Sequence, residues 1–133
     1  MAEILARSET HDWVIRALSR EPRGRLLDAP AGTGSLAERA KAIGFSVTCC
    51  DIDPSLFSVS GMEVEKADLN EPLPYASETF DVVTCLEGLE HLENPFSALR
   101  EFARVLRRGG KLFLSLPNYH RPFFEGSLTA KIR

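Results

Sequence analysis

The sequence has little of several features that would place a protein in a particular class. It carries 16 basic and 19 acidic residues, a net charge of −3, so it lacks the positive excess typical of nucleic-acid-binding proteins. No apolar run approaches the roughly 20 residues of a membrane span. The first residues do not form a charged and then apolar leader. We therefore expect a cytoplasmic protein, with no nucleic acid as an evident partner and no membrane span.

Cysteine is scarce and odd in number. Cys49, Cys50 and Cys85 all fall in strands that we expect to be buried, which is typical of reduced thiols in a cytosolic protein. Cys49 and Cys50 are adjacent, so their side chains should point to opposite faces of one strand. Glu87 and His91 are four residues apart, but the sequence suggests no third ligand beside them. We expect no metal site.

Apolar stretches alternate with helical patterns along the 133 residues, a length that allows one domain at most. This alternation predicts an α/β fold, with a doubly wound, mostly parallel sheet of about five strands flanked by helices. We expect an N-terminal helix within 1–22, a nucleoside-binding core over 23–117 and a tail over 118–133. The expected strands are 25–29, 46–51, 62–67, 80–86 and 111–116. The expected helices are 11–20, capped by Thr10, then 34–43, and one that carries Leu99, Phe102, Ala103 and Leu106 and ends at Gly109-Gly110.

A glycine-rich loop follows the first expected strand. It runs from Asp28 through Pro30 and Gly32 to Gly34, and glycine lets a ligand approach the main chain closely. The spacing is not the G-x-G-x-x-G of dinucleotide-binding loops. A carboxylate at Asp28 would repel a pyrophosphate but attract a cation. These features favour S-adenosylmethionine, which has a sulfonium and an ammonium and no phosphate, over a nicotinamide dinucleotide.

Four residues lie at or just past the ends of expected strands: Asp28, Asp51, Asp68 and Leu86. The carboxyl ends of parallel strands share one edge of the sheet, and ligands bind there at the topological switch point. A carboxylate at Asp51 can accept hydrogen bonds from both ribose hydroxyls. The alternative for Asp51 is a turn or cap before Pro54, but Asp53 suits that role better.

Five segments span roughly residues 24–118: they are 27–34, 51–54, 67–69, 80–83 with 89–91, and 104–111. Together these segments resemble the class I S-adenosylmethionine-dependent methyltransferases, in particular the methyltransferase type 11 family. The resemblance implies a Rossmann-like sheet of seven strands, of which about five are visible. In the family pattern a glycine usually stands where this chain has Pro30, which has no N–H to donate.

The resemblance also implies which residues hold S-adenosylmethionine and its product S-adenosylhomocysteine. Ile52 would pack on the adenine face, Asp68 would accept from the adenine amino group, and the Leu69 N–H would reach a ring nitrogen. Asp28 would orient the methionine end of the cofactor. The full set of expected cofactor-binding residues is Asp28, Ala29, Ala31, Gly32, Gly34, Asp51, Ile52, Asp68, Leu69 and Leu86.

The expected function is methyl transfer from S-adenosylmethionine to a small-molecule acceptor with an O, N or C nucleophile. His91 is the candidate general base for an acceptor hydroxyl, and a structural role at a helix start is its alternative. Two further alternatives stay open: a non-catalytic S-adenosylmethionine-binding module or subunit, and a nicotinamide-dependent dehydrogenase, since Asp51 alone would fit either cofactor.

Two expectations concern the C-terminal part of the chain. The tail 118–133 reads as the start of an acceptor-binding region. The last expected strand would present an exposed apolar edge, and such an edge invites pairing with another chain. Either further strands of the same protein or a second copy in a homodimer would cover it.

A basic stripe from Arg100 to Lys111, including Arg104, is predicted to form a solvated face near a helix C-terminus.

Overall fold

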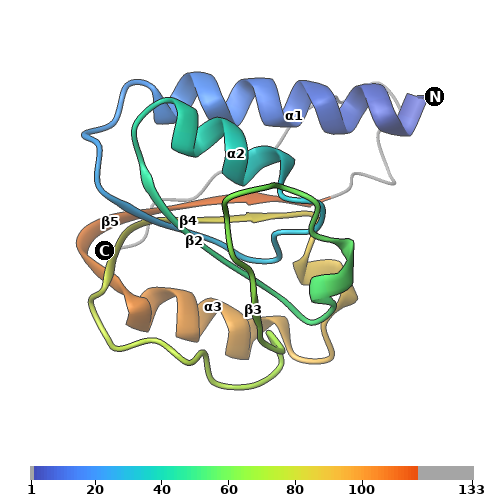
Figure 1. The fold of residues 1–133 in the computed structure, drawn as a ribbon. Helices are drawn as coiled ribbons and strands as arrows, with labels where there is room; N and C mark the ends of the chain where they lie inside the picture. Colours follow the sequence, from blue (N-terminus) through green and yellow to red (C-terminus); the bar gives the residue numbers. More distant parts are fainter. Residues whose placement is uncertain (1, 117–133) are drawn as a thin grey trace.

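The computed structural model describes residues 2–116, with side chains from Glu9 onward. Five parallel strands form one sheet in the order β3-β2-β1-β4-β5. Helices α1 and α2 cover one face of the sheet and α3 covers the other (Figure 1). The predicted doubly wound α/β fold is therefore confirmed. The elements are α1 (Ala2–Leu18), β1 (Arg25–Asp28), α2 (Ser35–Ala42), β2 (Ser46–Asp51), the 3-10 turn η1 (Pro54–Leu56), β3 (Glu65–Lys66), β4 (Phe80–Leu86), the 3-10 turn η2 (Leu89–His91), α3 (Pro95–Val105) and β5 (Leu106–Ser115).

Each central strand is buried on both faces, which explains its near-continuous apolar sequence. In β1, Leu26 belongs to the core beneath α1 and α2, and Leu27 belongs to the core above α3. Val82 and Val83 of β4 divide in the same way. Full burial of such a side chain contributes roughly 1.5–3 kcal/mol, so both layers of helices are held to the sheet by the hydrophobic effect.

The strand order places a switch point between β1 and β4. After β1 the chain moves outward to β2 and β3, and after β4 it moves outward to β5 on the other side. The loops that follow β1 and β4 therefore run in opposite directions from the carboxyl ends of these two strands, where ligands of doubly wound sheets bind. Asp28 and Leu86 end these two strands, and Asp51 ends β2.

The first helix starts much earlier than predicted. It begins at Ala2, so Thr10 lies inside the helix and is not its N-cap. The residues before Thr10 are rich in Ala, Glu, Leu and Arg, which have high helix propensity, and a single threonine does not interrupt such a segment.

The boundary between α3 and β5 was also predicted wrongly. The helix ends at Val105, and Leu106 already pairs with Phe80 as a strand residue. Between this pair and the next, Val82 with Lys111, the register shifts. Gly109 takes a φ of +76° within that irregular stretch, so it forms part of a bulged strand and does not terminate the helix. Leu106 is buried as a strand residue and would also be buried as the last residue of the helical stripe, which is why the sequence pattern assigned it to the helix.

The third strand is shorter than predicted. Only Glu65 and Lys66 pair with β2, whereas the prediction covered 62–67. Met62 and Val64 instead pack their side chains against the small cluster that contains Cys49. Side-chain packing therefore diverts the segment from the sheet edge before the ladder begins.

Arg104 holds the loop that leads from β3 into β4, and it is not part of a solvated face. Its guanidinium forms a two-point pair with the Glu101 carboxylate, with N–O distances of 2.7 and 3.0 Å. It also donates to the carbonyl oxygens of Leu73, at 3.1 Å, and Tyr75, at 2.9 Å. Glu101 in turn accepts from the Leu73 N–H at 2.7 Å, and Arg104 holds the pKa of Glu101 below its usual range.

We expect Arg104→Met to lower the free energy of unfolding by about 2 kcal/mol, because it leaves Glu101 and two carbonyl oxygens without their charged donor. Arg100→Met is the matched control, since Arg100 is exposed on the same helix and should change stability by less than about 0.5 kcal/mol. Urea unfolding of both variants measures the difference. Equal stability of the two would show that Arg104 does not hold the loop.

Candidate functional site

Asp51 joins the two loops that follow β1 and β2. Its side chain is only 5% exposed. One carboxylate oxygen accepts from the Gly32 N–H at 2.8 Å, and the other accepts from the Asp53 N–H at 2.9 Å. Each carboxylate oxygen has two lone-pair sites, so Asp51 keeps acceptor capacity for a ligand. The carboxylate is thus held in place at the carboxyl edge of the sheet.

The loop after β1 uses its N–H groups inside the protein. Ala29 donates to the Thr84 carbonyl and Ala31 donates to the Cys50 carbonyl, both at 2.9 Å. The Gly32 N–H is bound by Asp51, and the Gly34 N–H reaches the Ala31 carbonyl. A phosphate-binding loop needs such groups free to face the anion. These four N–H groups are therefore not free to face a pyrophosphate, in agreement with the sequence argument.

The two glycines of the loop have different surroundings. A Cβ on Gly32 would meet nothing within 4 Å, so this position is open to a ligand. A Cβ on Gly34 would lie 2.5 Å from the Phe57 ring and 2.7 Å from Val59. Both glycines have positive φ, +55° and +89°. Gly34 is therefore required for close packing inside the protein.

We expect Gly34→Ala to lower the free energy of unfolding by several kcal/mol, from steric overlap added to about 1–2 kcal/mol of left-handed backbone strain. Gly32→Ala carries only the strain and is the matched control. Thermal unfolding of the pair tests this difference. Equal losses of stability in the two variants would contradict it.

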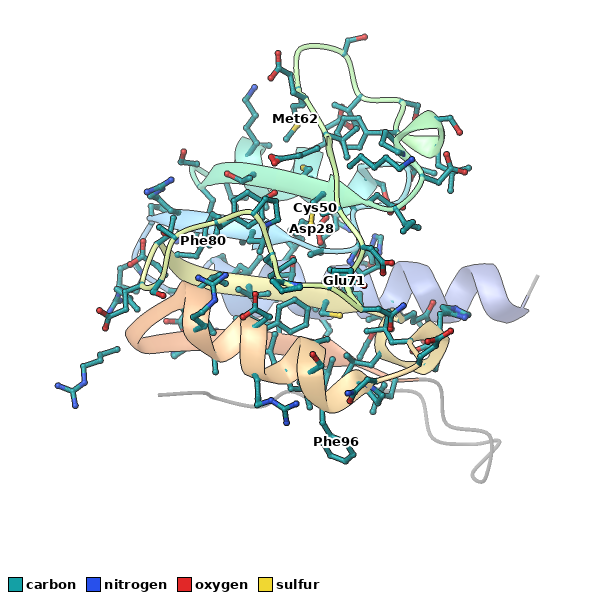
Figure 2. The ribbon with its side chains drawn as sticks, turned by 90° about the horizontal axis from the view of Figure 1, so that it is seen from below. Asp28, Cys50, Met62, Glu71, Phe80 and Phe96 are labelled. Atoms are coloured by element: carbon teal, nitrogen blue, oxygen red, sulfur yellow. The ribbon has the colours of Figure 1, made fainter. Side chains whose placement is uncertain are left out.

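Asp28 is a buried carboxyl group, 2% exposed, at the end of β1. Its Oδ1 accepts from the Thr84 hydroxyl at 2.8 Å. The pKa of Asp28 is raised to about 7: burial is the largest cause, the Thr84 hydrogen bond opposes it, and the nearby Asp51 charge adds to the increase. Figure 2 shows Asp28 close to Cys50 in the interior of the molecule. A buried acid of this kind, without a cationic partner among the ion pairs of residues 9–116, suits a cationic ligand group.

The two residues after Asp51 have different environments: the Ile52 side chain is exposed, and the Asp53 side chain caps a turn. Ile52 is 56% exposed although it directly follows a buried strand. An exposed apolar side chain beside a fixed carboxylate is a surface on which an aromatic base can pack. Asp53 accepts from the Ser55 N–H at 3.2 Å and caps η1, as the sequence predicted.

Asp68 and Leu69 follow β3 at the same edge of the sheet. The Ala67 N–H donates to the Asp51 carbonyl at 3.0 Å, which places this segment beside the end of β2. Asp68 accepts from the Asn70 N–H at 2.9 Å and is partly exposed, and the Leu69 side chain is buried in the core. One Asp68 oxygen therefore maintains the local turn.

The end of β4 shows geometry that the sequence did not reveal. Beyond Leu86, Glu87 has a φ of +53°, and its N–H donates to the buried Ser115 at both the hydroxyl, at 2.9 Å, and the carbonyl, at 3.1 Å. A Cβ on Gly88 would lie 2.5 Å from the Pro30 ring. The proline that departs from the family pattern is thus accommodated by a glycine 58 positions later in the sequence.

His91 lies at the end of η2 and is exposed. Its Nε2 is 3.5 Å from the Glu90 carboxylate. The hydrogen bonds of Asp28 and Asp51 do not include it. The structure thus brings Asp28, Asp51 and the glycine loop together, while His91 stands apart from this hydrogen-bonded set.

Residues 2–116 contain no group of three or more His, Cys, Asp or Glu side chains that could hold a metal ion. Within the same residues, every helix is too short or too polar to cross a membrane. All three cysteines are buried and free, as predicted, and burial raises the pKa of Cys49 and of Cys50 to about 12.

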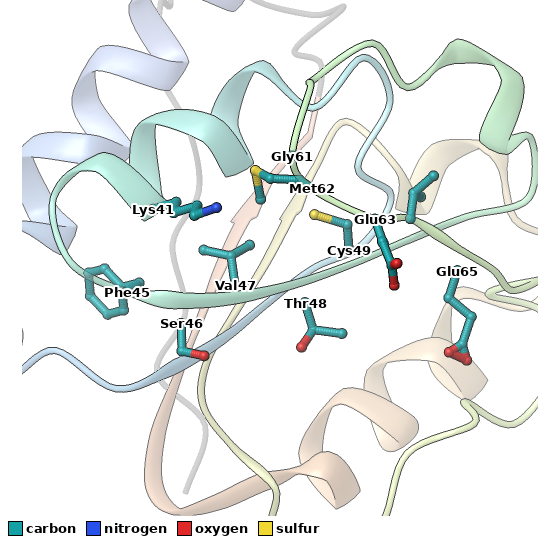
Figure 3. Close-up of a pocket in the computed structure, with 11 residues that line it drawn as sticks. Lys41, Phe45, Ser46, Val47, Thr48, Cys49, Gly61, Met62, Glu63 and Glu65 are labelled. Carbon is teal, nitrogen blue, oxygen red and sulfur yellow. The ribbon is translucent and has the colours of Figure 1, made fainter.

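A hollow of about 660 Å³ lies between β2 and the segment 61–65, which leads into β3 (Figure 3). Lys41, Val47, Cys49, Met62 and Glu63 are among its lining residues. Neither Asp28 nor Asp51 lines it, so this hollow is separate from the site at the carboxyl edge.

Comparison with known proteins agrees with the fold and the loop chemistry. Residues 27–114 match the family described as "Methyltransferase domain", and this chain belongs to that family. The chain is 38% identical over 108 residues to the ubiquinone biosynthesis O-methyltransferase of Xanthomonas axonopodis pv. citri, covering 74% of this chain and 45% of that protein. It is 35% identical over 116 residues to the protein of the same name from Dechloromonas aromatica, covering 80% and 50%. The chain thus spans about half the length of these relatives.

Solved structures share the architecture. The PH0226 protein of Pyrococcus horikoshii superposes with a TM-score of 0.76 at 23% identity, over 91% of this chain and 57% of that one. An S-adenosylmethionine-dependent methyltransferase of Mesorhizobium loti superposes with a TM-score of 0.69 at 25% identity, over 80% and 54%. The Rossmann-like methyltransferase fold is therefore established for this chain.

Proposed function

We propose that this chain binds S-adenosylmethionine and forms part of an enzyme that transfers its methyl group to a hydroxyl oxygen of a small-molecule acceptor. The observation that carries the proposal is that two fixed carboxylates lie beside a loop in which four N–H groups are already bonded inside the protein. Asp28 suits a cation, Asp51 suits a ribose diol, and the bonded N–H groups of the loop are not free for a phosphate.

The residues present fit this cofactor. We propose that Asp51 accepts from the ribose hydroxyls while it keeps its bonds to the loop, and that Ile52 packs on the adenine. Asp28 would bind the methionine ammonium, and Gly32 leaves the space that the ligand needs. The same proposal includes the other expected binding residues, which are Ala29, Ala31, Gly34, Asp68, Leu69 and Leu86.

Bound S-adenosylmethionine supplies an electrophilic methyl group on its sulfonium, so the protein's contribution is binding, alignment and exclusion of water. We propose that His91 accepts the proton of the acceptor hydroxyl, because it follows β4 at the edge where the cofactor would lie. Its exposure leaves Nε2 accessible to an acceptor.

The relatives support the choice of oxygen as the acceptor atom, since their name specifies an O-methyltransferase of ubiquinone biosynthesis. We propose the same class of acceptor for the whole protein to which this sequence belongs. The predicted acceptor region, 118–133, lies outside the described residues. We also propose a cytoplasmic location, which the three buried free thiols support.

Calorimetric titration of the 133-residue chain tests the proposal, with S-adenosylhomocysteine and S-adenosylmethionine as ligands and NAD as the control. We expect micromolar binding of the first two, about −8 kcal/mol, and none of NAD. A chain that is folded by circular dichroism but binds neither sulfur ligand would overturn the proposal. Binding of NAD in preference would replace it with the dehydrogenase alternative.

β5 forms one edge of the sheet within residues 2–116. We propose that this edge is covered either by further strands of the same protein or by a second copy of the chain. Analytical ultracentrifugation of the chain separates these cases, because only the second predicts a dimer.

A further inference from the structure

We propose that Thr84 is a positioning residue for cofactor binding: its hydroxyl fixes one oxygen of the Asp28 carboxylate and so leaves the other for the cationic end of the ligand. Thr84 was not among the residues expected from the sequence. The inference rests on the proposed function, because it requires that Asp28 contact the cofactor.

The geometry of the pair carries the inference. Thr84 is fully buried and lies directly opposite Asp28 on the neighbouring strand. Its Oγ1 is 2.8 Å from Asp28 Oδ1 and 3.5 Å from the Leu27 carbonyl. A hydroxyl has one proton to donate, and a carboxylate at the shorter distance is the stronger acceptor. The proton therefore goes to Asp28, whose Oδ2 accepts no hydrogen bond from the residues that the structure describes.

The electrostatic surroundings of Asp28 make this hydrogen bond important. From β2, Asp51 raises the pKa of Asp28, and the thiols of Cys49 and Cys50 are neutral because burial raises their own pKa values to about 12. From β4, burial likewise raises the pKa of the Cys85 thiol, so that thiol is neutral too.

Among the residues that the structure describes, those on α1 and α2 supply no competing partner for Asp28, whose pKa is shifted by Thr84 and Asp51 besides burial. On α1, His11 contacts Ser35, and Asp12 pairs with Arg39 of α2. Thr84 is thus the group that favours the charged form of Asp28, against burial and Asp51. Loss of its hydroxyl should raise the pKa of Asp28 above about 7, so that the carboxyl is protonated over more of the physiological range.

The test is the pH dependence of S-adenosylhomocysteine binding between pH 6 and 8.5, measured by calorimetry on the full chain. In the parent, affinity should rise as pH increases through about 7, because ionised Asp28 attracts the ammonium. Thr84→Val removes the donor at nearly constant volume and should weaken binding about tenfold at pH 7, with the midpoint displaced to higher pH. Thr84→Ser restores the donor and should restore the parent profile.

A second comparison separates positioning from structural damage. In an Asp28→Asn background, Thr84→Val should leave the pH profile unchanged, because the titrating group is already absent. Urea unfolding confirms that each variant is folded. A uniform loss of affinity at every pH that Thr84→Ser does not rescue would overturn the inference. So would an unchanged profile in Thr84→Val. Failure of the parent to bind S-adenosylhomocysteine at any pH would instead overturn the proposed function.

Discussion

Asp51→Ala should weaken S-adenosylhomocysteine binding by about 2 kcal/mol or more, roughly 30-fold. A hydrogen bond to a charged group contributes about 1.5–3 kcal/mol, and this carboxylate is proposed to accept from the ribose diol. The same side chain also binds the Gly32 and Asp53 N–H groups, so its removal loosens the loop as well. Calorimetry at fixed pH and salt gives the affinity directly.

Two controls separate the direct role of Asp51 from its effect on the loop. Asp53→Ala removes a neighbouring carboxylate that only caps η1, and it should change affinity by less than about threefold. For an S-adenosylhomocysteine analogue without the 2′- and 3′-hydroxyls, Asp51→Ala should reduce affinity only through the loosened loop, so the difference between the two ligands gives the ribose contribution. An Asp51→Ala protein that binds S-adenosylhomocysteine as the parent does would show that the ribose assignment is wrong.

Asp28→Asn should have opposite effects on stability and on binding. The pKa of Asp28 is raised from 3.8 to about 7, so between these values the native state holds a proton that the unfolded chain has released. Stability therefore falls as pH rises from about 4 to 7, and above pH 7 the native protein carries a buried charge at a cost on the order of 4 kcal/mol. An amide removes that cost, so Asp28→Asn should be more stable than the parent by about 2–4 kcal/mol at pH 8.

The gain in stability should vanish near pH 4, where Asp28 is protonated in the parent as well. At pH 8 the same variant should bind S-adenosylhomocysteine at least tenfold more weakly, because the ammonium loses its charged partner. Urea unfolding at pH 4.5 and pH 8 measures the first effect and calorimetry the second.

Asp81→Asn is the matched control of opposite sign. The pKa of Asp81 is lowered by the Arg25 N–H and the Arg107 guanidinium, so its ionised form stabilises the fold above the normal aspartate pKa. That contribution is lost as pH falls through the lowered pKa. Asp81→Asn should therefore destabilise the protein at pH 8. Destabilisation at pH 8 by Asp28→Asn too would refute the assignment of Asp28 as a strained buried acid.

Several features of the site were predictable because parallel strands end at one edge. Asp28, Asp51 and Leu86 were placed there by strand periodicity alone, and the structure confirms their positions. The role of Asp53 as a turn residue also followed from its place before Pro54. Their proposed contacts with the cofactor stay predictions.

Other features were not predictable, because they depend on which atoms meet. The two glycines of one loop look equivalent in sequence, yet Gly32 faces open space and Gly34 packs against Phe57. Leu106 continues a helical stripe, yet it is the first residue of β5. Arg104 belongs to a basic stripe, yet it holds the loop before β4.

The sequence by itself determined the alternation of strands and helices, the two-sided burial of the central strands and the carboxylates at their ends. These depend on hydrophobic periodicity and on residues close in the chain. The tertiary structure alone decided the partners of those carboxylates, since Asp51 meets Gly32 across 19 positions and Asp28 meets Thr84 across 56. Periodicity reports which face a residue buries and carries no information about which distant polar group lies opposite. Hydrogen bonds require that information, because they form only at short distance and in the right direction.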